Sequence, residues 1–244
     1  MLVGGSPYAR HTLTDEAKSE HSVSNSTIEE PADLRVVRDS YDRVADNYAR
    51  MVAAEALGDI RQQPWLRAAI DVFADAVGGI GPVLDVGCGP GTVTAYLQER
   101  GLDVSGVDLS PQMIANAIRL HPQCQFAVGS WTDIDLPADS YGGILGWWSL
   151  FNLPRSVVPQ VFSRCARALR PGGQFIIATH AGDEDVTRTE AYGGVPVQWT
   201  THRWRPEPLA AHLEAAGLRT TAVLNLPPEH GIGPVFVIVG QRDE

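Results

Sequence analysis

The residues best suited to chemistry form a glycine-rich turn. Gly87, Gly89 and Gly91 directly follow the apolar run Leu84-Asp85-Val86. Glycines permit positive φ angles and a close approach of backbone to ligand, and free N–H groups at a helix start favour polar or anionic groups. Asp108 lies 21 residues after Gly87, where a carboxylate can take both hydroxyls of a ribose. Turn and acid together indicate a nucleoside-containing cofactor.

The spacing of the glycines narrows the choice of cofactor. The dinucleotide fingerprint is G-x-G-x-x-G, whereas this turn is G-x-G-x-G and continues with Thr92. A pyrophosphate site is therefore disfavoured. A phosphate-binding loop that ends in Gly-Lys-Ser/Thr is also excluded, because the single lysine of the chain is Lys18.

Alternating strand and helix signals surround this turn. Apolar periodicity predicts seven strands, at residues 82–86, 104–108, 125–128, 143–148, 175–179, 220–224 and 235–239. It predicts helices at residues 64–77, 92–100, 111–120, 157–169 and 207–216, and another that begins at Leu34. The expected fold is α/β: a Rossmann-like, doubly wound, seven-stranded sheet, mostly parallel, with an antiparallel C-terminal edge hairpin and an N-terminal helical cover.

The chain divides into a tail and one domain. Residues 1–33 are polar and lack periodicity, so we predict a disordered tail, with a lid that orders on binding as the alternative. Residues 34–244 form the domain, with the N-terminal helices in 34–80. Residues 183–205 are predicted to be an irregular insertion on the substrate side, because they are too long for a bare connection.

Composition excludes several classes of protein. The 244 residues carry a net charge of −10, which argues against nucleic-acid binding. The longest apolar runs are too short to cross a bilayer, and no signal peptide is recognisable. Cys88, Cys124 and Cys165 are odd in number and widely spaced, which favours a reducing compartment. We expect a cytoplasmic protein with a small-molecule partner and no membrane partner; the oligomeric state stays open.

At this point the chain resembles the class I S-adenosylmethionine-dependent methyltransferase family, over about residues 36–240. The matching segments are Val83 to Gly91, Asp108, Leu136-Pro137 with Tyr141 to Leu145, and Leu169-Arg170-Pro171-Gly172-Gly173. The resemblance implies S-adenosylmethionine as cofactor and S-adenosylhomocysteine as product. The pattern is specific for the fold and says little about the acceptor.

The resemblance also implies a set of cofactor-binding residues. The three glycines would pass beneath the methionine moiety, Asp108 would hold the ribose, and Leu109 and Met113 would flank the adenine. The remaining members of the set are Asp85, Ser130, Trp131 and Trp147.

The adenine amine contact and the segment that closes over the cofactor are assigned separately. The chain lacks the family's commoner Asp after the third strand, so the adenine amine contact falls to Ser130, Asp133 or backbone. Tyr41 and Tyr48 look like the segment that closes over the cofactor; the alternative is two aromatic residues that pack a helix onto the sheet, because seven-residue spacing is also helical periodicity.

The acceptor should bind beyond the carboxyl ends of strands four and five. Aromatic residues are concentrated there, which suits a flat apolar acceptor or a sulfonium, although any of these tryptophans could simply fill the core. The expected substrate-binding residues are Trp148, Phe151, Asn152, Tyr192, Trp199 and Trp204.

A general base is optional, since the methyl group of a sulfonium is already activated. His180 and His202 are the candidate catalytic residues, with an ordinary structural histidine as the alternative for each. Asp183, Glu184 and Asp185 are adjacent acids of the kind that form a solvated face, so no metal is predicted.

The predicted function is methyl transfer from S-adenosylmethionine to a small, aromatic or heterocyclic acceptor in specialised metabolism (natural product biosynthesis), with an indole-type acceptor as one option. One alternative is a methyltransferase of quinone or lipid precursors. The other is a cofactor-binding pseudoenzyme without turnover. A nucleic-acid methyltransferase is disfavoured, because Phe151-Asn152-Leu153-Pro154 stands where an Asn/Asp-Pro-Pro-Tyr-like tetrad would be.

Overall fold

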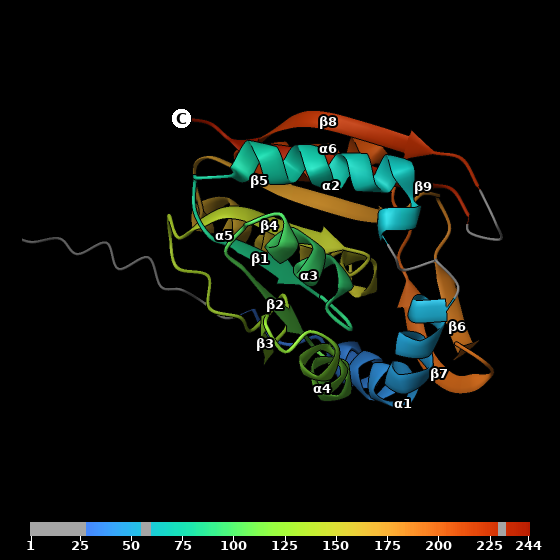
Figure 1. The fold of residues 1–244 in the computed structure, drawn as a ribbon. Coiled ribbons are helices and arrows are strands. Elements are labelled where there is room, and N and C mark those ends of the chain that lie inside the picture. Colours follow the sequence, from blue (N-terminus) through green and yellow to red (C-terminus); the bar gives the residue numbers. More distant parts are fainter. Residues whose placement is uncertain (1–27, 55–59, 229–232) are drawn as a thin grey trace, which may run out of the picture.

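A seven-stranded sheet runs through the molecule (Figure 1). The computed structural model describes residues 28–54, 60–228 and 233–244, so most of the predicted tail lies outside the described residues. The helical elements are α1 (Ala32–Ala54), η1 (Ile60–Gln62), α2 (Pro64–Val77), α3 (Thr92–Glu99), α4 (Pro111–Leu120), η2 (Leu150–Asn152), α5 (Val158–Ala168) and α6 (Pro206–Ala215). The strands are β1 (Val83–Val86), β2 (Val104–Asp108), β3 (Gln125–Val128), β4 (Tyr141–Trp147), β5 (Leu169–His180), β6 (Val186–Ala191), β7 (Val195–Thr201), β8 (Leu218–Leu226) and β9 (Val235–Arg242).

The strand order of the main sheet is β3-β2-β1-β4-β5-β9-β8. The first five strands are parallel, whereas β9 is antiparallel to both β5 and β8. This confirms the expected Rossmann-like fold. The order reverses between β1 and β4, and in open α/β sheets ligands bind at that switch, outside the carboxyl ends of the strands.

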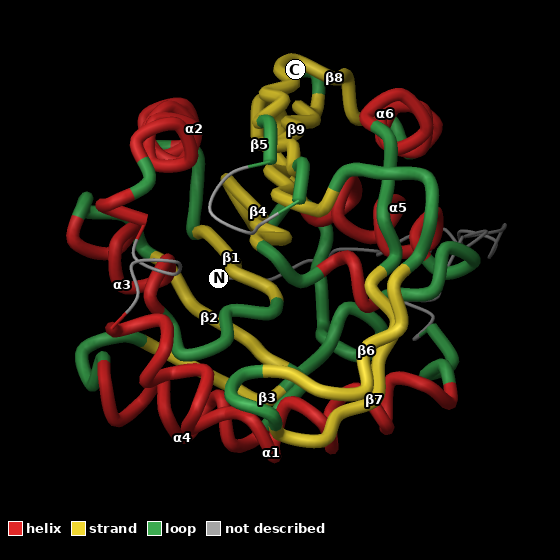
Figure 2. The backbone as a smooth tube through the Cα atoms, turned by 90° about the vertical axis from the view of Figure 1, so that its right-hand side faces the viewer, coloured by secondary structure: helices red, strands yellow, loops and turns green. Residues whose placement is uncertain are grey.

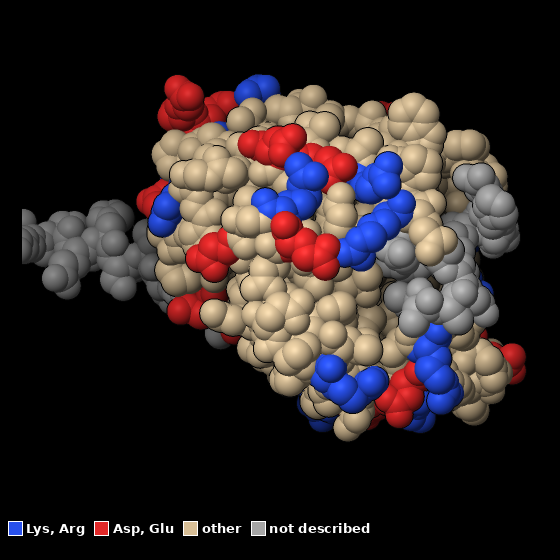
Figure 3. All heavy atoms as spheres, viewed as in Figure 1, with Lys and Arg blue, Asp and Glu red and all other residues tan. Residues whose placement is uncertain are grey.

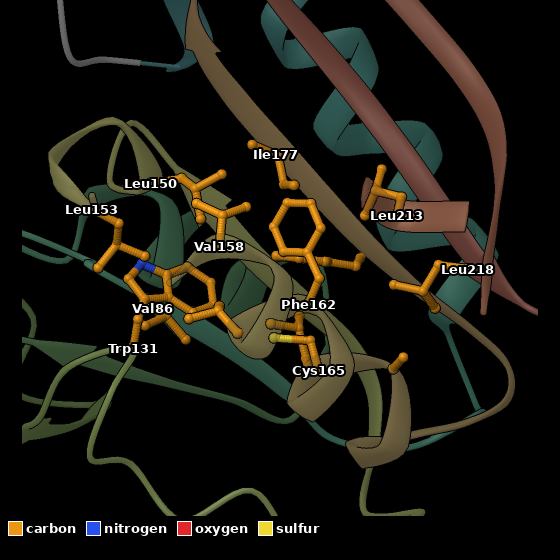
Figure 4. Close-up of a cluster of buried hydrophobic side chains, with 14 of the residues drawn as sticks. Val86, Trp131, Leu150, Leu153, Val158, Phe162, Cys165, Ile177, Leu213 and Leu218 are labelled. Atoms are coloured by element: carbon orange, nitrogen blue, oxygen red, sulfur yellow. The ribbon is translucent and has the colours of Figure 1, made fainter. Parts of the chain in front are cut away.

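Two apolar layers cover the two faces of the sheet. Alternation along β5 divides its side chains: Phe175 and Ile177 pack with Phe162 of α5, as Figure 4 shows for part of this cluster, while Ile176 faces the opposite layer with Phe73 of α2. All of these side chains are at most 1% exposed. The core therefore fixes the strand ends that border the site.

The predicted irregular insertion is in fact a β-hairpin. Strands β6 and β7 pair antiparallel as a separate two-stranded sheet, and Tyr192, Gly193 and Gly194 form the turn with φ angles of 44°, 90° and 79°. Along β7 the buried residues alternate with exposed ones, which is the period expected of a half-buried strand. The long connection thus has a regular structure that positions side chains.

The predicted N-terminal cover consists of two helices with different positions. Helix α2 packs on one face of the sheet, whereas α1 lies beside α4 and the hairpin (Figure 2). Ser40 of α1 exchanges hydrogen bonds with the backbone of Gln198, whose N–H donates to Ser40 Oγ over 3.0 Å. Helix α1 and the hairpin together form a wall opposite the carboxyl ends of the strands.

The boundary between α5 and β5 also differs from the prediction. Helix α5 ends at Ala168, and β5 begins at Leu169, which pairs with Tyr141. An irregularity in the register follows before Gln174 pairs with Gly143. The Pro171-Gly172-Gly173 segment, which follows the predicted helix at residues 157–169, therefore lies inside a longer, bulged strand.

The surface in view in Figure 3 carries interleaved acidic and basic side chains. On α2 and α3, Arg100 forms ion pairs with Asp71 at 3.0 Å and with Asp75 at 2.7 Å. No helix among the described residues is long and apolar enough to span a membrane.

Candidate active site

A cavity of about 1020 Å³ lies at the carboxyl ends of the strands. Its walls come from the glycine turn, from the ends of β2, β4 and β5, and from α1 opposite them. The predicted site residues that line it are Tyr41, Tyr48, Gly87, Gly89, Asp108, Leu109, Met113, Ser130, Trp131, Trp148, Phe151, Asn152, His180 and Tyr192. The structure thus brings most of the predicted cofactor set and part of the predicted substrate set into one space.

The three glycines of the turn have different roles. All have positive φ, of 79°, 54° and 82° for Gly87, Gly89 and Gly91. A Cβ on Gly87 would lie 2.1 Å from Ser149 Cβ, and one on Gly91 would lie 2.5 Å from Phe126 Cζ. A Cβ on Gly89 would meet nothing nearer than a Tyr48 ring carbon at 3.8 Å. Gly87 and Gly91 therefore allow the chain to pack, whereas Gly89 leaves open space for a ligand.

The carboxylate of Asp108 is held in place by backbone donors. The N–H of Gly89 donates to Oδ2 and the N–H of Ser110 donates to Oδ1, both over 2.8 Å. Burial raises the pKa of Asp108 to about 6, and these two hydrogen bonds oppose that rise. Each oxygen keeps a lone pair, so the group remains able to accept hydrogen bonds from two neighbouring hydroxyls.

Asp85 and Trp147, which are both in the predicted cofactor-binding set, do not line this cavity. They border a smaller cavity of about 80 Å³ behind the turn. Asp85 Oδ2 accepts a hydrogen bond from Thr94 Oγ1 of α3 over 2.7 Å, and burial raises the pKa of Asp85 to about 7. Trp147 packs in the apolar layer under α2, because alternation along β4 directs its side chain to that face.

Residues after β3 close one end of the cavity. The N–H of Ser130 donates to Asp133 Oδ1 over 2.6 Å, and Ser130 Oγ lies 2.9 Å from Thr132 Oγ1. Asp133 therefore stabilises this turn, and it is not among the lining residues. Trp131 is 4% exposed and packs against Phe175, so it belongs mainly to the core (Figure 4), although it also lines the cavity.

Tyr41 and Tyr48 face the cavity from α1. The Tyr41 hydroxyl donates to Asn152 Oδ1 over 3.0 Å, and its ring stacks on Trp199 with centroids 4.7 Å apart. The Tyr48 ring meets Tyr192 edge-on at 4.8 Å. Burial raises the pKa of both tyrosines, so both are neutral hydroxyls. This arrangement fits the expected closing segment better than helix-to-sheet packing.

Polar contacts that sequence reasoning missed hold α1 in this position. Asp42 accepts hydrogen bonds from Ser110 Oγ at 2.5 Å and from the Gln112 N–H at 3.1 Å, at the start of α4. One turn further along, Asp46 accepts from Asn116 at 3.0 Å. A signal existed in the sequence, because two acids four residues apart on a helix form one face.

The acceptor end of the cavity is aromatic around one histidine. His180 is the last residue of β5. The centroid of its ring lies 5.5 Å from that of Trp148 and 5.0 Å from that of Phe151. Burial, together with smaller contributions from nearby Arg203 and Arg188, lowers the pKa of His180 to about 4, so the imidazole is neutral near pH 7. Trp148 has a φ of 57°, an uncommon conformation for a bulky residue, which directs the chain into η2.

His202, the second catalytic candidate, does not line the cavity. Its Nδ1 lies 2.7 Å from Asp185 Oδ2, and Arg155 forms an ion pair with the same carboxylate at 2.7 Å. Burial raises the pKa of Asp185, but the hydrogen bonds from Arg155 and His202 lower it more, so the pKa lies below its usual value. The three residues fasten the base of the hairpin to the segment before α5.

Trp199 and Trp204 do not line the cavity either, although both were predicted to bind substrate. Trp199 supports Tyr41 from behind. Trp204 is 5% exposed and belongs to the core, with the Arg155 guanidinium 4.9 Å above its ring. The contacts of both tryptophans are those expected from the alternative of core packing.

The adjacent acids after β5 also have structural partners. Asp183 pairs with Arg205 at 2.9 Å, and Asp185 takes part in the cluster above. In the part of the chain that the structure describes, no group of three His, Cys, Asp or Glu residues is arranged to hold a metal ion. All three cysteines are free thiols.

Several lining residues were missed altogether. They lie in α1, around the start of α2, at the end of β8 and at the start of β9, and they include Leu34, Val37, Met51, Gln63, Pro64, Trp65, Leu66, Leu226, Pro227 and Val235. The sequence could have indicated them only by their position in the fold. Segments next to a strand end, or just before a helix that covers the sheet, can lie at the edge formed by the carboxyl ends of the parallel strands.

Comparisons with known proteins agree with this geometry. Residues 83–173 match the family model described as a methyltransferase domain. The demethylmenaquinone methyltransferase of Beutenbergia cavernae is 31% identical over 138 residues, 57% of this chain and 55% of that protein, so the chain spans about half the length of the curated relatives it matches.

Solved structures share the fold. The 1,6-didemethyltoxoflavin-N1-methyltransferase of Burkholderia thailandensis, with 1,6-didemethyltoxoflavin and S-adenosylhomocysteine bound, has a TM-score of 0.66 at 21% identity, over 90% of this chain and 95% of that one. The magnesium protoporphyrin IX methyltransferase of Synechocystis, with S-adenosylmethionine bound, has a TM-score of 0.65 at 15% identity, over 89% of this chain and all of that one. The family match covers the strand, the glycine turn and the acidic residue that form one end of the cavity, so residues 83–173 are similar to a methyltransferase domain, and the solved structures show that the chain shares their fold.

Proposed function

We propose that the protein transfers a methyl group from S-adenosylmethionine to a small, uncharged acceptor with a flat aromatic or heterocyclic ring. The observation that carries this proposal is the continuity of the cavity. One space of about 1020 Å³ joins the glycine turn and Asp108 to Trp148, Phe151 and His180. Ligand pockets typically measure roughly 300–1,000 Å³, so this one has room for cofactor and acceptor together.

The residues at the turn fit the cofactor. Bound S-adenosylmethionine supplies a methyl group made electrophilic by its sulfonium. Asp108 has free lone pairs for the ribose hydroxyls, and the open space at Gly89 admits a ligand against the backbone. Leu109 and Met113 provide an apolar slot for the adenine ring beside Ser130.

At the other end, the aromatic side chains orient the acceptor and exclude water. Trp148 and Phe151 offer ring faces and edges on either side of His180. The neutral imidazole of His180 accepts a hydrogen bond from an acceptor O–H or N–H and takes its proton as the methyl group is transferred. The low pKa of His180 means that no proton has to leave the imidazole before this step.

The chemical class of the acceptor follows from the lining. Among the described lining residues, Asp108 and His180 are the only acidic or basic side chains, so a charged acceptor would lack a partner. Similar proteins carry the names of different acceptors, demethylmenaquinone and 1,6-didemethyltoxoflavin among them. We assign the enzyme to specialised metabolism, and an indole-type acceptor fits the same aromatic walls.

Two further assignments belong to this proposal. The net charge of −10 and the interleaved surface charges support a small-molecule acceptor over a nucleic acid. The three free thiols support a cytoplasmic location.

The test has two stages. Calorimetric titration with S-adenosylmethionine and S-adenosylhomocysteine is expected to show micromolar binding. Mass spectrometry of phenols, indoles, naphthols and amines incubated with protein and cofactor is then expected to show a product heavier by one methylene unit. Absence of cofactor binding would overturn the proposal, and binding without any methylated product across the panel would favour the pseudoenzyme.

A further inference from the structure

The cavity extends beyond the place where methyl transfer would occur. His180 of β5 pairs with Val235 of β9, and Val235 pairs in turn with Leu226 of β8. These three residues form a row across neighbouring strands at the carboxyl end of β5, and all three line the cavity. Strands lie about 4.8 Å apart, so the row runs roughly 10 Å from His180 to the edge strand.

Beyond His180 the row is apolar, because Val235 and Leu226 carry no polar side-chain atoms. Leu226 packs against the apolar layer that contains Leu66. Val235 pairs directly with Leu226, and directly paired residues lie on the same face of a sheet. Leu66 and Pro64, at the first turn of α2, form the opposite wall. The sheet and the helix thus border an apolar channel between His180 and the edge of the sheet.

The far end of this channel reaches solvent at Trp65. Trp65 lines the cavity and is nevertheless 66% exposed. Pro227, which also lines the cavity, is exposed as well. An exposed tryptophan at the border of a cavity is informative, since tryptophan side chains are on average highly buried. Val72, two turns along α2, is 69% exposed and does not line the cavity.

We propose that the acceptor carries an apolar chain, which runs from its ring along the row His180–Val235–Leu226 and leaves the protein between Trp65 and Pro227. The proposal rests on the function proposed above and adds the substrate class: an uncharged aromatic head with a hydrocarbon substituent. The described residues that line this channel carry no charged side chain, and a bare ring would leave its apolar length unfilled. Trp65 and Leu226 are then specificity-determining residues.

The proposal can be tested by binding, without turnover. The probes are 4-alkyl-1-naphthols with methyl, butyl and octyl chains, titrated calorimetrically into the protein saturated with S-adenosylhomocysteine. Affinity is expected to rise about fourfold for each methylene that the channel buries. An octyl chain with a terminal carboxylate is expected to bind nearly as well as plain octyl, because its end reaches solvent, whereas the same charge on butyl stays in the channel and should weaken binding at least tenfold.

A matched pair of variants on one helix locates the channel. Trp65→Ser should flatten the dependence of affinity on chain length, and Val72→Ser, an equally exposed apolar position outside the cavity, should leave the dependence as in the parent protein. Leu226→Ser is expected to act in the same direction as Trp65→Ser.

Three results would overturn the channel: equal affinity for methyl and octyl naphthol, equal effects of the Trp65 and Val72 substitutions, or a large penalty for the carboxylate on octyl. A protein that fails to bind S-adenosylhomocysteine would instead contradict the proposed function, so the two failures are distinguishable.

Discussion

The two ends of the cavity are built in different ways. At the cofactor end, backbone groups and residues close in sequence form the site: the turn supplies its own N–H groups, and Asp108 is fixed by Gly89 and Ser110. At the acceptor end, side chains from α1, β5, η2 and the hairpin meet across long stretches of chain. The first end is therefore set by local geometry and the second by tertiary packing, which leaves the acceptor end freer to vary with substrate.

The sharpest way to break this comparison is a pair of glycine substitutions. Gly87→Ala places a methyl group against Ser149 at positive φ and should destabilise the fold by about 3 kcal/mol. Gly89→Ala should cost about 1 kcal/mol of stability, from its positive φ, while it blocks the cofactor. Calorimetric melting and S-adenosylhomocysteine titration would check both; equal stability of the two variants would contradict the division of roles.

Asp108→Asn tests the cofactor end alone. Loss of the charge from hydrogen bonds to a ribose should reduce cofactor affinity by about 2–3 kcal/mol, or roughly a hundredfold. Asp133→Asn is the control, because Asp133 closes a turn outside the cavity. Unchanged affinity in Asp108→Asn would remove the ribose assignment.

His180 tests the acceptor end alone. His180→Ala should lower kcat about a hundredfold with cofactor affinity within twofold of the parent. His202→Gln, which alters a histidine outside the cavity, should retain kcat. Substantial activity in His180→Gln would show that the imidazole orients the acceptor by a hydrogen bond, and equal kcat in His180→Ala and parent would exclude both roles.

The pH dependence should separate the two ends. The pKa of Asp108 is raised to about 6, so below that pH its carboxyl is protonated and loses the charge that binds hydroxyls. Cofactor affinity should rise by up to about tenfold per unit as pH increases toward 6 and level off above it. Asp85 has a pKa of about 7, so it titrates over a similar pH range. The part of the pH dependence that Asp108 causes is therefore the part that is lost in Asp108→Asn. His180 stays neutral in this range, and acceptor affinity should be flat.

The smallest expected effect concerns the link between α1 and η2. Tyr41→Phe deletes the hydrogen bond to Asn152 and keeps the stack on Trp199, so stability should fall by about 1 kcal/mol. The comparison is thermal unfolding of this variant and of Tyr48→Phe, because the Tyr48 hydroxyl makes no hydrogen bond within the described residues. A loss of more than about 3 kcal/mol would mean that α1 depends on this contact.

The cofactor end could be predicted from sequence because its signals are local. The strand, the glycines and Asp108 follow one another within one strand–helix–strand unit, and Gly87, Gly89 and Asp108 line one cavity in the structure. Even there, sequence did not reveal that Gly91 and Gly87 serve packing, since their neighbours Phe126 and Ser149 are distant in the chain.

The acceptor end was only partly predictable, for a physical reason. Trp148 and Trp199 are the same residue type in neighbouring regions, yet one lines the cavity and the other supports Tyr41 from outside. The direction in which Trp199 points depends on the β6–β7 hairpin. The alternation of buried and exposed residues in this hairpin was hard to recognise in a segment rich in threonine and glycine. The place of His202 outside the cavity could not be predicted, because its partner, Asp185, becomes a neighbour only when β6 and β7 pair.

The position of β9 has a consequence for how the protein is made. This strand lies between β5 and β8 although it follows both in the chain, so the sheet cannot close until residues 235–242 have left the ribosome. Until then β5 presents an open, apolar edge of the kind that pairs with other chains. The glycine turn and Asp108 need none of these residues, whereas Val235 completes the row beside His180. We therefore expect a nascent chain to assemble its cofactor end before its acceptor channel, and to depend on chaperones during the interval.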